Sequence, residues 1–491
     1  MLPILAGLET EYGFSVEGHG AEDQIDDAIT LVRAYPGECF VGWDYRFESP
    51  RTDLRGFQVD QLAFDPQDAQ FDSGKIRPAD RDVRSDRVLL NGARFYNDHG
   101  HPEYSTPECW GLRELALHDR AGESVVLAAA QAMMNATGDV IRVYKNNSDF
   151  HGASYGTHEN YCVPRALGFD RLFAAVTPIL VARQVLTGAG KVGHEHGKPC
   201  DFQMTQRGDF FSESANVETL YRRPVFNTRD EPHADPADWI RLHVISGDAN
   251  MMLSCTQRKV GLVKLALTLA LQDRAPTWRL ANPAACFHAL SRDIDGEGRI
   301  ELEGGSWTTP RFILESYFEA IDLADADPEI ASLITECRQL LEQRFNEPDE
   351  FRRHVDWAAK RWLIGEYLES EGMRWDSPMA QSLDLGYHRI DPEEGLFPAL
   401  VQAGHVAEDV RAEDVHVRSQ HVCEPTRAFA RSLALRKFPE AVAGVSWGVL
   451  TLNLANETRH IALPPDRIYP EDLDSAETID QFATLLIREL S

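Results

Sequence analysis

The sequence predicts an α+β protein in which short extended segments form a sheet, longer helices pack against it, and a small C-terminal domain follows. Polar and apolar residues alternate in segments such as Ile4–Phe14, which is the period of a strand. Segments such as His118–Thr137 instead carry apolar residues at helical spacing. The length of 491 residues exceeds what one small hydrophobic core serves, so we expect a large domain with an appendage.

The composition narrows the functional classes. The formal charge is 49 − 78 = −29, so a broad phosphate-binding surface is excluded and no nucleic-acid partner is expected, although a local basic groove remains open. The eight cysteines are scattered without a C-x-x-C pair, which fits a reduced compartment. The N-terminus has no basic leader, and the most apolar helical segment, Val260–Leu271, is too short to span a bilayer. We therefore expect a soluble cytoplasmic protein with no membrane partner.

The first predicted strand, Ile4–Phe14, carries two acids. Glu9 and Glu11 are two residues apart, so both side chains project from the same face of the strand. If that face lines a cavity, Mg²⁺ is the natural counter-charge for two carboxylates. The alternative is a pair of acids on an exposed strand face, and the pattern alone favours neither.

A long polar segment follows the first predicted helix, Asp23–Tyr35. Residues 43–87 are rich in Asp and Arg and show no regular period. Loops of that length without their own structure are uncommon and are usually functional or disordered. The segment is either a lid or regulatory loop, or a plain flexible insertion.

The segment Asn91–Cys109 has the highest density of ligand-type side chains. We expect a strand over Val88–Tyr96 that leads into it. Counting by two places Arg94, Tyr96 and Asp98 on one face, where a cation, a hydroxyl and a carboxylate converge. A turn-stabilising role for Asp98 is the alternative, but its neighbours on that face favour a catalytic role. We interpret this segment as the floor of an active site.

Further candidate ligands follow along the chain. After a glycine turn, Glu103 and Thr106 begin the return segment. His158 lies where a glycine-rich loop re-enters extended structure, and Arg241 and His243 share one face of another predicted strand. A single histidine is more often a core or surface residue than a ligand. A second histidine within the same predicted sheet adds weight to a metal site.

The second half of the chain contains a local basic cluster and a helical scaffold. The cluster consists of Arg222, Arg223 and Arg229, and Arg207 is a further cation near the presumed end of the sheet. The cluster would attract a carboxylate or phosphate ligand, or else form a surface ion-pair patch with neighbouring acids. Trp307–Arg374 is helical throughout. The smaller C-terminal region contains a predicted strand with Trp447 and a closing helix over Ala476–Leu490.

Seven segments carry a family-level signal. They are GLETEYG at 7–13, NGARFYNDHGHPEYSTPEC at 91–109, YKNNSD at 144–149, SYGTHENY at 154–161, RQVLTGAGKVG at 183–193, NTRDEPHAD at 227–235 and RLHVISGDAN at 241–250. In this order they resemble the family formed by the Pup ligase and the deamidase/depupylase of Pup, the prokaryotic ubiquitin-like protein. The resemblance implies a glutamine-synthetase-like fold, with a curved antiparallel sheet cradle backed by helices in residues 1–415 and a small C-terminal domain in residues 416–491.

The resemblance also implies cofactors and site residues. ATP, or ADP plus phosphate, and Mg²⁺ are expected in the cradle. By position, Glu9, Tyr96 and Glu103 match magnesium-binding residues, Arg94, Thr106 and Trp447 match ATP-contacting residues, Asp98 matches the catalytic aspartate, and Glu11, His158, Arg241 and His243 complete the metal and nucleotide site. Arg207, Arg222, Arg223 and Arg229 are expected to bind the acidic tail of Pup.

Two features resemble the hydrolytic branch of the family. They are the long insertion, with WDYRFESP at 43–50 and RGF at 55–57, and the segment DHGHPEY at 98–104. The resemblance therefore implies hydrolysis of the C-terminal glutamine amide of Pup and of Pup–lysine isopeptide bonds, with nucleotide and Mg²⁺ not consumed and with a functional link to a bacterial proteasome. Asn97 and Gly100 depart from the pattern, which leaves open a divergent relative acting on a Pup-like modifier.

Two further alternatives remain, an ATP-consuming Pup–protein ligase and a non-catalytic nucleotide-bound adaptor. The insertion argues against the ligase, and the retained Asp98 argues against the adaptor. For a hydrolase, Asp98 either attacks the amide carbonyl or acts as a base on water.

Overall fold

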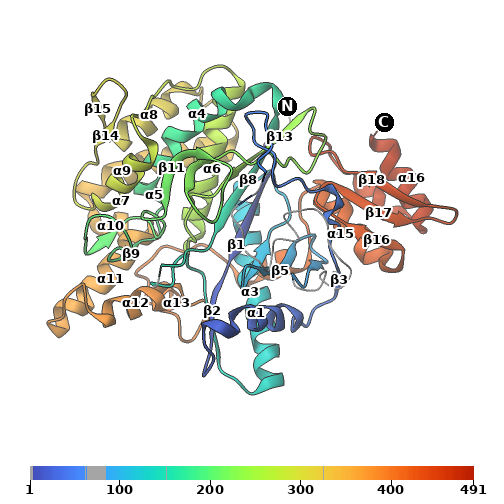
Figure 1. Ribbon diagram of the computed structural model, residues 1–491, viewed down its shortest axis with the longest axis horizontal. Helices are drawn as coiled ribbons and strands as arrows, with labels where there is room; N and C mark the ends of the chain where they lie inside the picture. The colour runs from blue at the N-terminus through green and yellow to red at the C-terminus, as the bar shows by residue number, and fades with distance from the viewer. Residues whose placement is uncertain (1–3, 61, 63–83, 151, 325, 491) are drawn as a thin grey trace.

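An antiparallel sheet of seven strands, in the order β13-β8-β1-β6-β5-β4-β3, forms the centre of the protein (Figure 1). The computed structural model describes residues 4–60, 62, 84–150, 152–324 and 326–490. Residues 61 and 63–83 of the predicted insertion lie outside this description. The strands are β1 (Ala6–Glu11), β3 (Cys39–Val41), β4 (Arg87–Leu89), β5 (Arg94–Asp98), β6 (His101–Ser105), β8 (Thr157–Pro164) and β13 (Trp239–Val244).

The two faces of this sheet differ in chemistry because successive side chains of a strand point to opposite faces. In β1, Ala6 and Leu8 join the hydrophobic core behind the sheet, while Glu9 and Glu11 alternate with them. In β8, every second residue from Thr157 to Val163 is buried, and the residues between them are half-buried. The core-facing side is apolar, and the other side carries the charged residues.

Helices cover the apolar face. Two hydrophobic cores lie behind the sheet, one behind β1, β8 and β13 and one behind β5 and β6. The helices are α1 (Gln24–Arg33), α3 (Leu112–Thr137), α4 (Gly168–Ala182), α5 (Gln184–Thr187), α6 (Leu253–Leu271), α7 (Pro283–Arg292), α8 (Pro310–Ala320), α9 (Pro328–Asn346), α10 (Pro348–Arg352), α11 (Asp356–Glu371), α12 (Pro378–His388), α13 (Leu396–Gln402) and α14 (Ala412–Gln420). The helical scaffold predicted over Trp307–Arg374 is found from Pro310 to Glu371, in α8 to α11, but the prediction is wrong at its start, where Trp307–Thr308 form a short strand.

Short strand pairs complete the large body. Most of these pairs are antiparallel, and β11 with β12 is parallel. The pairs are β2 (Gly13–Val16) with β7 (Ile141–Tyr144), β9 (Lys191–Val192) with β10 (Phe202–Gln203), β11 (Phe211–Asn216) with β12 (Arg223–Asn227), and β14 (Ile300–Glu301) with β15 (Trp307–Thr308).

The C-terminal elements have a hydrophobic core of their own, which also receives Val88 from β4. They lie at one side of the molecule, opposite the helices α8–α11 (Figure 1). The elements are α15 (Arg427–Lys437), β16 (Val442–Val445), β17 (Val449–Asn453), β18 (Thr458–Ala462) and α16 (Ile479–Leu490). The division of the chain at residue 415 stays a prediction.

Two predicted strands have different limits in the structure. The prediction of one strand over Val88–Tyr96 is wrong, because β4 ends at Leu89 and β5 begins at Arg94. Gly92 turns the chain between them with a φ of 78°, and a Cβ there would meet Ala428 O at 3.0 Å. The predicted strand that contains Arg241 and His243 corresponds to β13, which ends at Val244.

Within the described part of the chain, no helix has both the length and the apolar surface that crossing a bilayer requires.

Candidate active site in the sheet cradle

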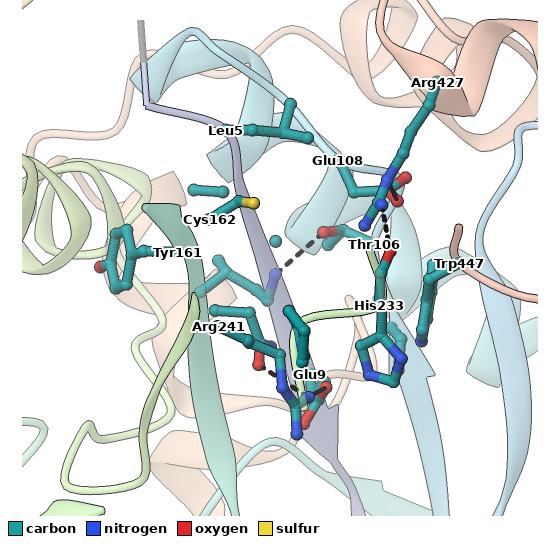
Figure 2. Close-up of a pocket in the computed structure, with 16 residues that line it drawn as sticks. Leu5, Glu9, Thr106, Glu108, Tyr161, Cys162, His233, Arg241, Arg427 and Trp447 are labelled. Carbon is teal, nitrogen blue, oxygen red and sulfur yellow. Dashed lines mark hydrogen bonds and ion pairs between the residues drawn. The ribbon is translucent and has the colours of Figure 1, made fainter. Parts of the chain in front are cut away.

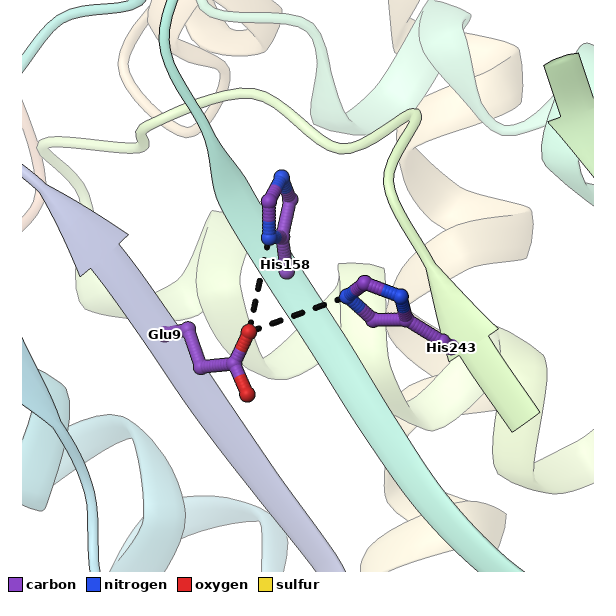
Figure 3. Close-up of side chains that lie close together, drawn as sticks. All are labelled: Glu9, His158 and His243. Carbon is purple, nitrogen blue, oxygen red and sulfur yellow. Dashed lines mark ion pairs between the residues drawn. The ribbon is translucent and has the colours of Figure 1, made fainter. Parts of the chain in front are cut away.

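The first candidate site on the polar face contains Glu9, His158 and His243, which come from three adjacent strands (Figure 3). Glu9 pairs in register with His158 across β1 and β8, and β13 brings His243 from the far side of β8. Oε2 of Glu9 lies 3.4 Å from Nδ1 of His158 and 3.7 Å from Nε2 of His243. Oε1 of Glu9 lies 3.5 Å from the Arg241 guanidinium. The fold thus brings these four predicted site residues together.

The ionisation of this group follows from burial and charge. Burial alone would raise the pKa of Glu9, but hydrogen bonds with His158 and His243 and the charge of Arg241 bring that pKa well below its usual value. Burial and the charge of Arg241 lower the pKa of His243 to about 3. A carboxylate beside a neutral imidazole is a donor pair suited to a metal ion.

The second candidate site contains Glu11, Asp98 and Glu103, whose ligand oxygens all lie within 4.8 Å of one another. The strand register explains the cluster, because Glu103 pairs with Glu11 on one side and with Tyr96 on the other. Tyr96 donates a hydrogen bond of 2.5 Å from its hydroxyl to Oε1 of Glu103. The same hydroxyl thereby orients one of the three carboxylates.

Two acids of this second group, Glu103 and Asp98, have opposite electrostatic environments. Burial, followed by the charges of Asp98, Glu9 and Glu11, raises the pKa of Glu103 well above its usual value. Burial also opposes the ionisation of Asp98, but its neighbours His99 and Arg84 bring the pKa of Asp98 well below its usual value. The cluster thus holds one stabilised carboxylate and one that lacks a compensating cation.

The donor sets fit the cation that the sequence predicts. Three carboxylates in one small space match the preference of Mg²⁺ for hard oxygen ligands. Glu9 with two imidazoles is a mixed oxygen and nitrogen donor set. Such a set is less selective for Mg²⁺ than three carboxylates are, because it also suits transition metals. The metal-binding roles of Glu9, Glu11, Tyr96, Glu103, His158 and His243 remain predictions, now with a geometry that supports them.

All three residues of the first group, together with Asp98 and Glu103 of the second, line one cavity of about 140 Å³. The insertion contributes to its wall through Tyr45, Glu48 and Arg84. Burial and the charge of Glu231 raise the pKa of Glu48 to about 7. The part of the insertion that the structure describes therefore reaches the acid-lined cavity.

Arg94 is held inside this wall. Its guanidinium lies 2.6 Å from Oδ1 of Asp86, and it donates to the Tyr45 hydroxyl at 2.7 Å. It also lies 3.8 Å from the ring centroid of Tyr96 and 4.3 Å from that of Trp43. Arg94 thus lines the cavity as predicted, and its guanidinium interacts with Trp43, Tyr45 and Asp86 of the insertion.

A smaller and more apolar cavity of about 50 Å³ adjoins the first, and both are lined by Glu9, His233, Arg241 and Trp447 (Figure 2). Its polar end contains Thr106, whose hydroxyl oxygen accepts a hydrogen bond from the Leu8 amide at 3.0 Å. An apolar slot beside an acidic chamber suits a ligand with one flat apolar end and one charged end. Thr106 lines this slot, and Arg241 and Trp447 lie where the slot meets the acidic cavity.

Buried ion pairs fix the wall of this slot. Arg427 of α15 donates to Oε1 of Glu108 at 2.7 Å and to the His233 carbonyl at 2.6 Å (Figure 2). Arg431 pairs with the other oxygen of Glu108 at 2.5 Å and donates to the Trp447 carbonyl at 3.1 Å. The C-terminal elements are thereby tied to the large body at the slot itself.

The four arginines expected to bind substrate do not lie in equivalent places. Arg207 is only 1% exposed and donates to the Ile245 carbonyl at 2.7 Å, which does not fit contact with a protein substrate at the surface. The exposed Arg222 pairs with Glu213, and Arg223 donates to main-chain carbonyls. Of the four, Arg229 lines the acidic cavity. The single basic cluster expected from the sequence is therefore dispersed.

Several residues of the cavities were not singled out from the sequence. Tyr45, Glu48 and Arg84 belong to the insertion, and His233 lies in the NTRDEPHAD segment. Asp86, also in the insertion, pairs with the cavity-lining Arg94. The WDYRFESP segment contains Tyr45 and Glu48, so its resemblance to the hydrolytic branch was a usable signal. No local pattern indicated Arg84 or Asp86, because both contact the site only after the chain has folded back on β5.

The antiparallel cradle and its acid-lined cavity define an α+β enzyme. The chain belongs to the family described as Pup-ligase protein, whose model matches residues 4–451. The family membership and fold class predicted from the sequence are confirmed.

Curated relatives from both branches of this family are similar to the chain. The Pup deamidase/depupylase of Mycobacterium tuberculosis is 34% identical over 471 residues, covering 92% of each chain. The depupylase of Acidothermus cellulolyticus is 35% identical and covers 91% of this chain and 90% of its own. The Pup–protein ligase of Rhodococcus opacus is 36% identical, but the match covers 75% of this chain and 85% of the ligase.

Two solved structures share the fold. The ligase PafA in its complex with Pup superposes with a TM-score of 0.78 at 26% identity, over 99% of this chain and 92% of that one. The Pup ligase PafA in complex with ADP superposes with a TM-score of 0.73 at 28% identity, over 89% and 97% of the two chains. The fold of this chain is therefore that of an enzyme family of the Pup pathway.

Proposed function

We propose that this chain is a Pup deamidase and depupylase, which hydrolyses the C-terminal glutamine side-chain amide of Pup and the isopeptide bond between Pup and lysine. One observation carries the proposal. The insertion that distinguishes the hydrolytic branch forms part of the wall of the cavity that contains Asp98. The match to relatives named deamidase/depupylase, which extends over 92% of the chain, supports the same branch.

The proposal includes nucleotide and Mg²⁺ as cofactors that are not consumed. The apolar slot between Trp447 and His233 would hold the base, and the phosphates would extend past Arg241 toward the carboxylates. Glu9, Glu11, Glu103, His158 and His243 would hold the metal. Bound there, the metal would supply positive charge to the amide that is cleaved, and the phosphates would help to hold the metal in place.

The residues of this chain have separate tasks in the proposed reaction. Hydrolysis breaks the carbon–nitrogen bond of the amide, forms a carbon–oxygen bond, and delivers a proton to the departing nitrogen. Asp98 supplies either the attacking oxygen or the base that takes a proton from water. The Tyr96 hydroxyl keeps Glu103 oriented beside it, and the two histidines keep Glu9 in place. In single-turnover hydrolysis in ¹⁸O-water, label found in the Asp98 carboxyl group identifies attack by Asp98, because water that opens the resulting anhydride at the Asp98 carbonyl leaves its oxygen there.

The partner and setting follow from the same proposal. The partner is Pup or a Pup-like modifier and its conjugates, in the cytoplasm, with a functional link to a bacterial proteasome. Of the predicted substrate-binding arginines, Arg229 faces the cavity and Arg222 and Arg223 lie outside it. We propose that these three contact the modifier and that Arg207 supports the fold.

The experiment is incubation of the purified protein with Pup ending in glutamine and, separately, with a Pup–lysine conjugate. Mg²⁺ and a non-hydrolysable ATP analogue are present, and intact mass is read. We expect conversion of the amide to the acid and release of free Pup. Asp98→Asn abolishes both, whereas Asp26→Asn, an exposed position on α1, leaves them unchanged.

The ligase relatives and the PafA structures give the alternative function its specific support. A ligase joins a glutamate side chain to lysine and consumes ATP. If conjugate forms only when Pup ending in glutamate and ATP are supplied, with ADP produced in proportion, the proposed hydrolase is wrong. If the protein binds nucleotide but catalyses neither reaction, the remaining alternative is a non-catalytic nucleotide-bound adaptor.

A further inference from the structure

Both oxygens of the Asp98 carboxylate are engaged by neighbouring side chains. Oδ1 lies 2.5 Å from a guanidinium nitrogen of Arg84, and Oδ2 lies 3.1 Å from Nδ1 of His99. The Arg84 and Asp98 side chains are 12% and 17% exposed, so the contact is largely shielded from water. Such a contact restricts rotation of the carboxylate about its χ angles more than a solvent-exposed ion pair would.

The backbone holds Arg84 in place for this contact. Its carbonyl accepts a hydrogen bond of 2.7 Å from the Asn97 amide, which ties the end of the insertion to β5 beside Asp98. The other cavity-lining arginine of this sheet region, Arg94, is already paired with Asp86. Arg84 is therefore the arginine placed to act on Asp98.

Like charges make such a partner necessary. The ligand oxygens of Glu11 and Glu103 lie within 4.8 Å of the Asp98 carboxylate. Carboxylates at that separation repel one another, and a side chain with a free χ1 would turn away toward water. A cation bound on the other side of Asp98 opposes this rotation and keeps the carboxylate in the cavity.

We propose that Arg84 is a positioning residue of the hydrolytic reaction, which holds the Asp98 carboxylate in its reactive orientation against repulsion from Glu11 and Glu103. This inference rests on the proposed function, since it assigns a task to the insertion in amide hydrolysis. It gives the insertion a chemical contribution to the site through a single guanidinium group.

The test compares Arg84→Met and Arg84→Lys with the wild-type protein on Pup ending in glutamine. We expect kcat to fall on the order of a hundredfold in Arg84→Met, because a misplaced reactive group costs about that much. KM and nucleotide affinity should change less than about threefold, since Asp98 is not a binding group. Arg84→Lys should recover part of the loss, as should millimolar guanidinium added to Arg84→Met. Arg51→Met, an exposed position of the same insertion, is the matched control.

Two outcomes overturn the inference. One is an unchanged or increased kcat in Arg84→Met, and an increase would make Arg84 a restraint on Asp98. The other comes from a double-mutant cycle in thermal denaturation with Arg84→Met and Asp98→Asn. We expect the double variant to shift Tm by clearly less or more than the sum of the single variants, and strict additivity contradicts the contact. The cycle needs no activity, so a wild-type protein without amidase activity refutes the proposed function while the cycle still decides whether Arg84 and Asp98 interact.

Discussion

Two groups of buried acids lie on opposite faces of β1 and differ in how their charge is compensated. The cavity-side acids are Glu11, Asp98 and Glu103, whose ligand oxygens share one small space. The helix-side acids are Asp119 and Glu123 of α3, which lie 2.7 and 2.9 Å from Nζ of Lys145. Thr10, between Glu9 and Glu11 in β1, donates to Asp119 at 2.9 Å and so marks the opposite face.

The pKa values of Asp119 and Glu103, one acid from each group, move in opposite directions. Burial opposes ionisation of Asp119, but Lys145 and Lys259 bring its pKa below the usual value. Burial and like charges raise the pKa of Glu103. Compensated acids stabilise a fold, whereas uncompensated acids cost stability that only a bound cation restores. The two faces of β1 therefore differ: Asp119 on the helix side is paired with lysines, whereas Glu103 on the cavity side has no such partner to lower its pKa.

Removing charge from the cavity side should have the largest effect. Glu103→Gln should reduce amidase activity on the order of a thousandfold, because one of the electrostatic partners of the reaction is lost. The metal-free protein should nevertheless become more heat-stable, since the neutral amide relieves repulsion. Rate measurement and thermal denaturation in EDTA check both effects, with the exposed Glu22→Gln as control. A lower Tm in EDTA would contradict the comparison.

The matched change on the helix side should have the reverse effect. Asp119→Asn should lower the free energy of unfolding by about 3 kcal/mol, because a buried ion pair loses one partner. Activity per folded molecule should stay within a few-fold of wild type. Urea denaturation and the amidase assay measure the two quantities. Loss of activity at unchanged stability would place Asp119 in the reaction instead.

Stabilisation by ligand should also differ between variants on the two faces of β1. Mg²⁺ with ATP at about a hundred times Kd should raise the free energy of unfolding by about 2.7 kcal/mol. Asp119→Asn should keep this increment, and Glu103→Gln should lose most of it. Thermal denaturation with and without ligand gives the increments. Equal increments in the two variants would mean that Glu103 does not hold the cation.

The stabilisation by Asp119 should depend on pH. Its folded-state pKa lies below the unfolded value of about 3.9, so the stabilisation is complete above that value and is lost as the pH falls through the folded-state pKa. The stability difference between wild type and Asp119→Asn should therefore shrink below about pH 4, by at most about 1.4 kcal/mol per pH unit. Urea midpoints measured from pH 7 downward test this. A difference that grows on acidification would reverse the sign.

The smallest expected effect concerns Thr10. Thr10→Val removes the hydroxyl that donates to Asp119 and keeps the shape of the side chain. The free energy of unfolding should fall by about 1 kcal/mol, with amidase activity retained. Urea denaturation detects the change. An activity loss would show that a change on the helix side of β1 alters the cavity on its other side.

Local periodicity was enough to predict which side chains of the candidate site share a strand face. Spacing by two placed Glu9 with Glu11, and Tyr96 with Asp98, on common faces, because Cβ atoms alternate along any strand. The family resemblance supplied the sheet cradle and the order of its blocks. The interrupted strand at Gly92 was missed because a tight turn can hide between two segments of similar composition.

Contacts between distant parts of the chain could not be predicted from periodicity. The sequence alone placed carboxylates on the right strands, since strand geometry is local. The fold determined that Glu48 and Arg84 reach the cavity, that Arg207 is buried, and that Arg427 closes the apolar slot. These positions depend on the path of the chain through space and on which buried charges find partners, and neither is encoded in any short segment.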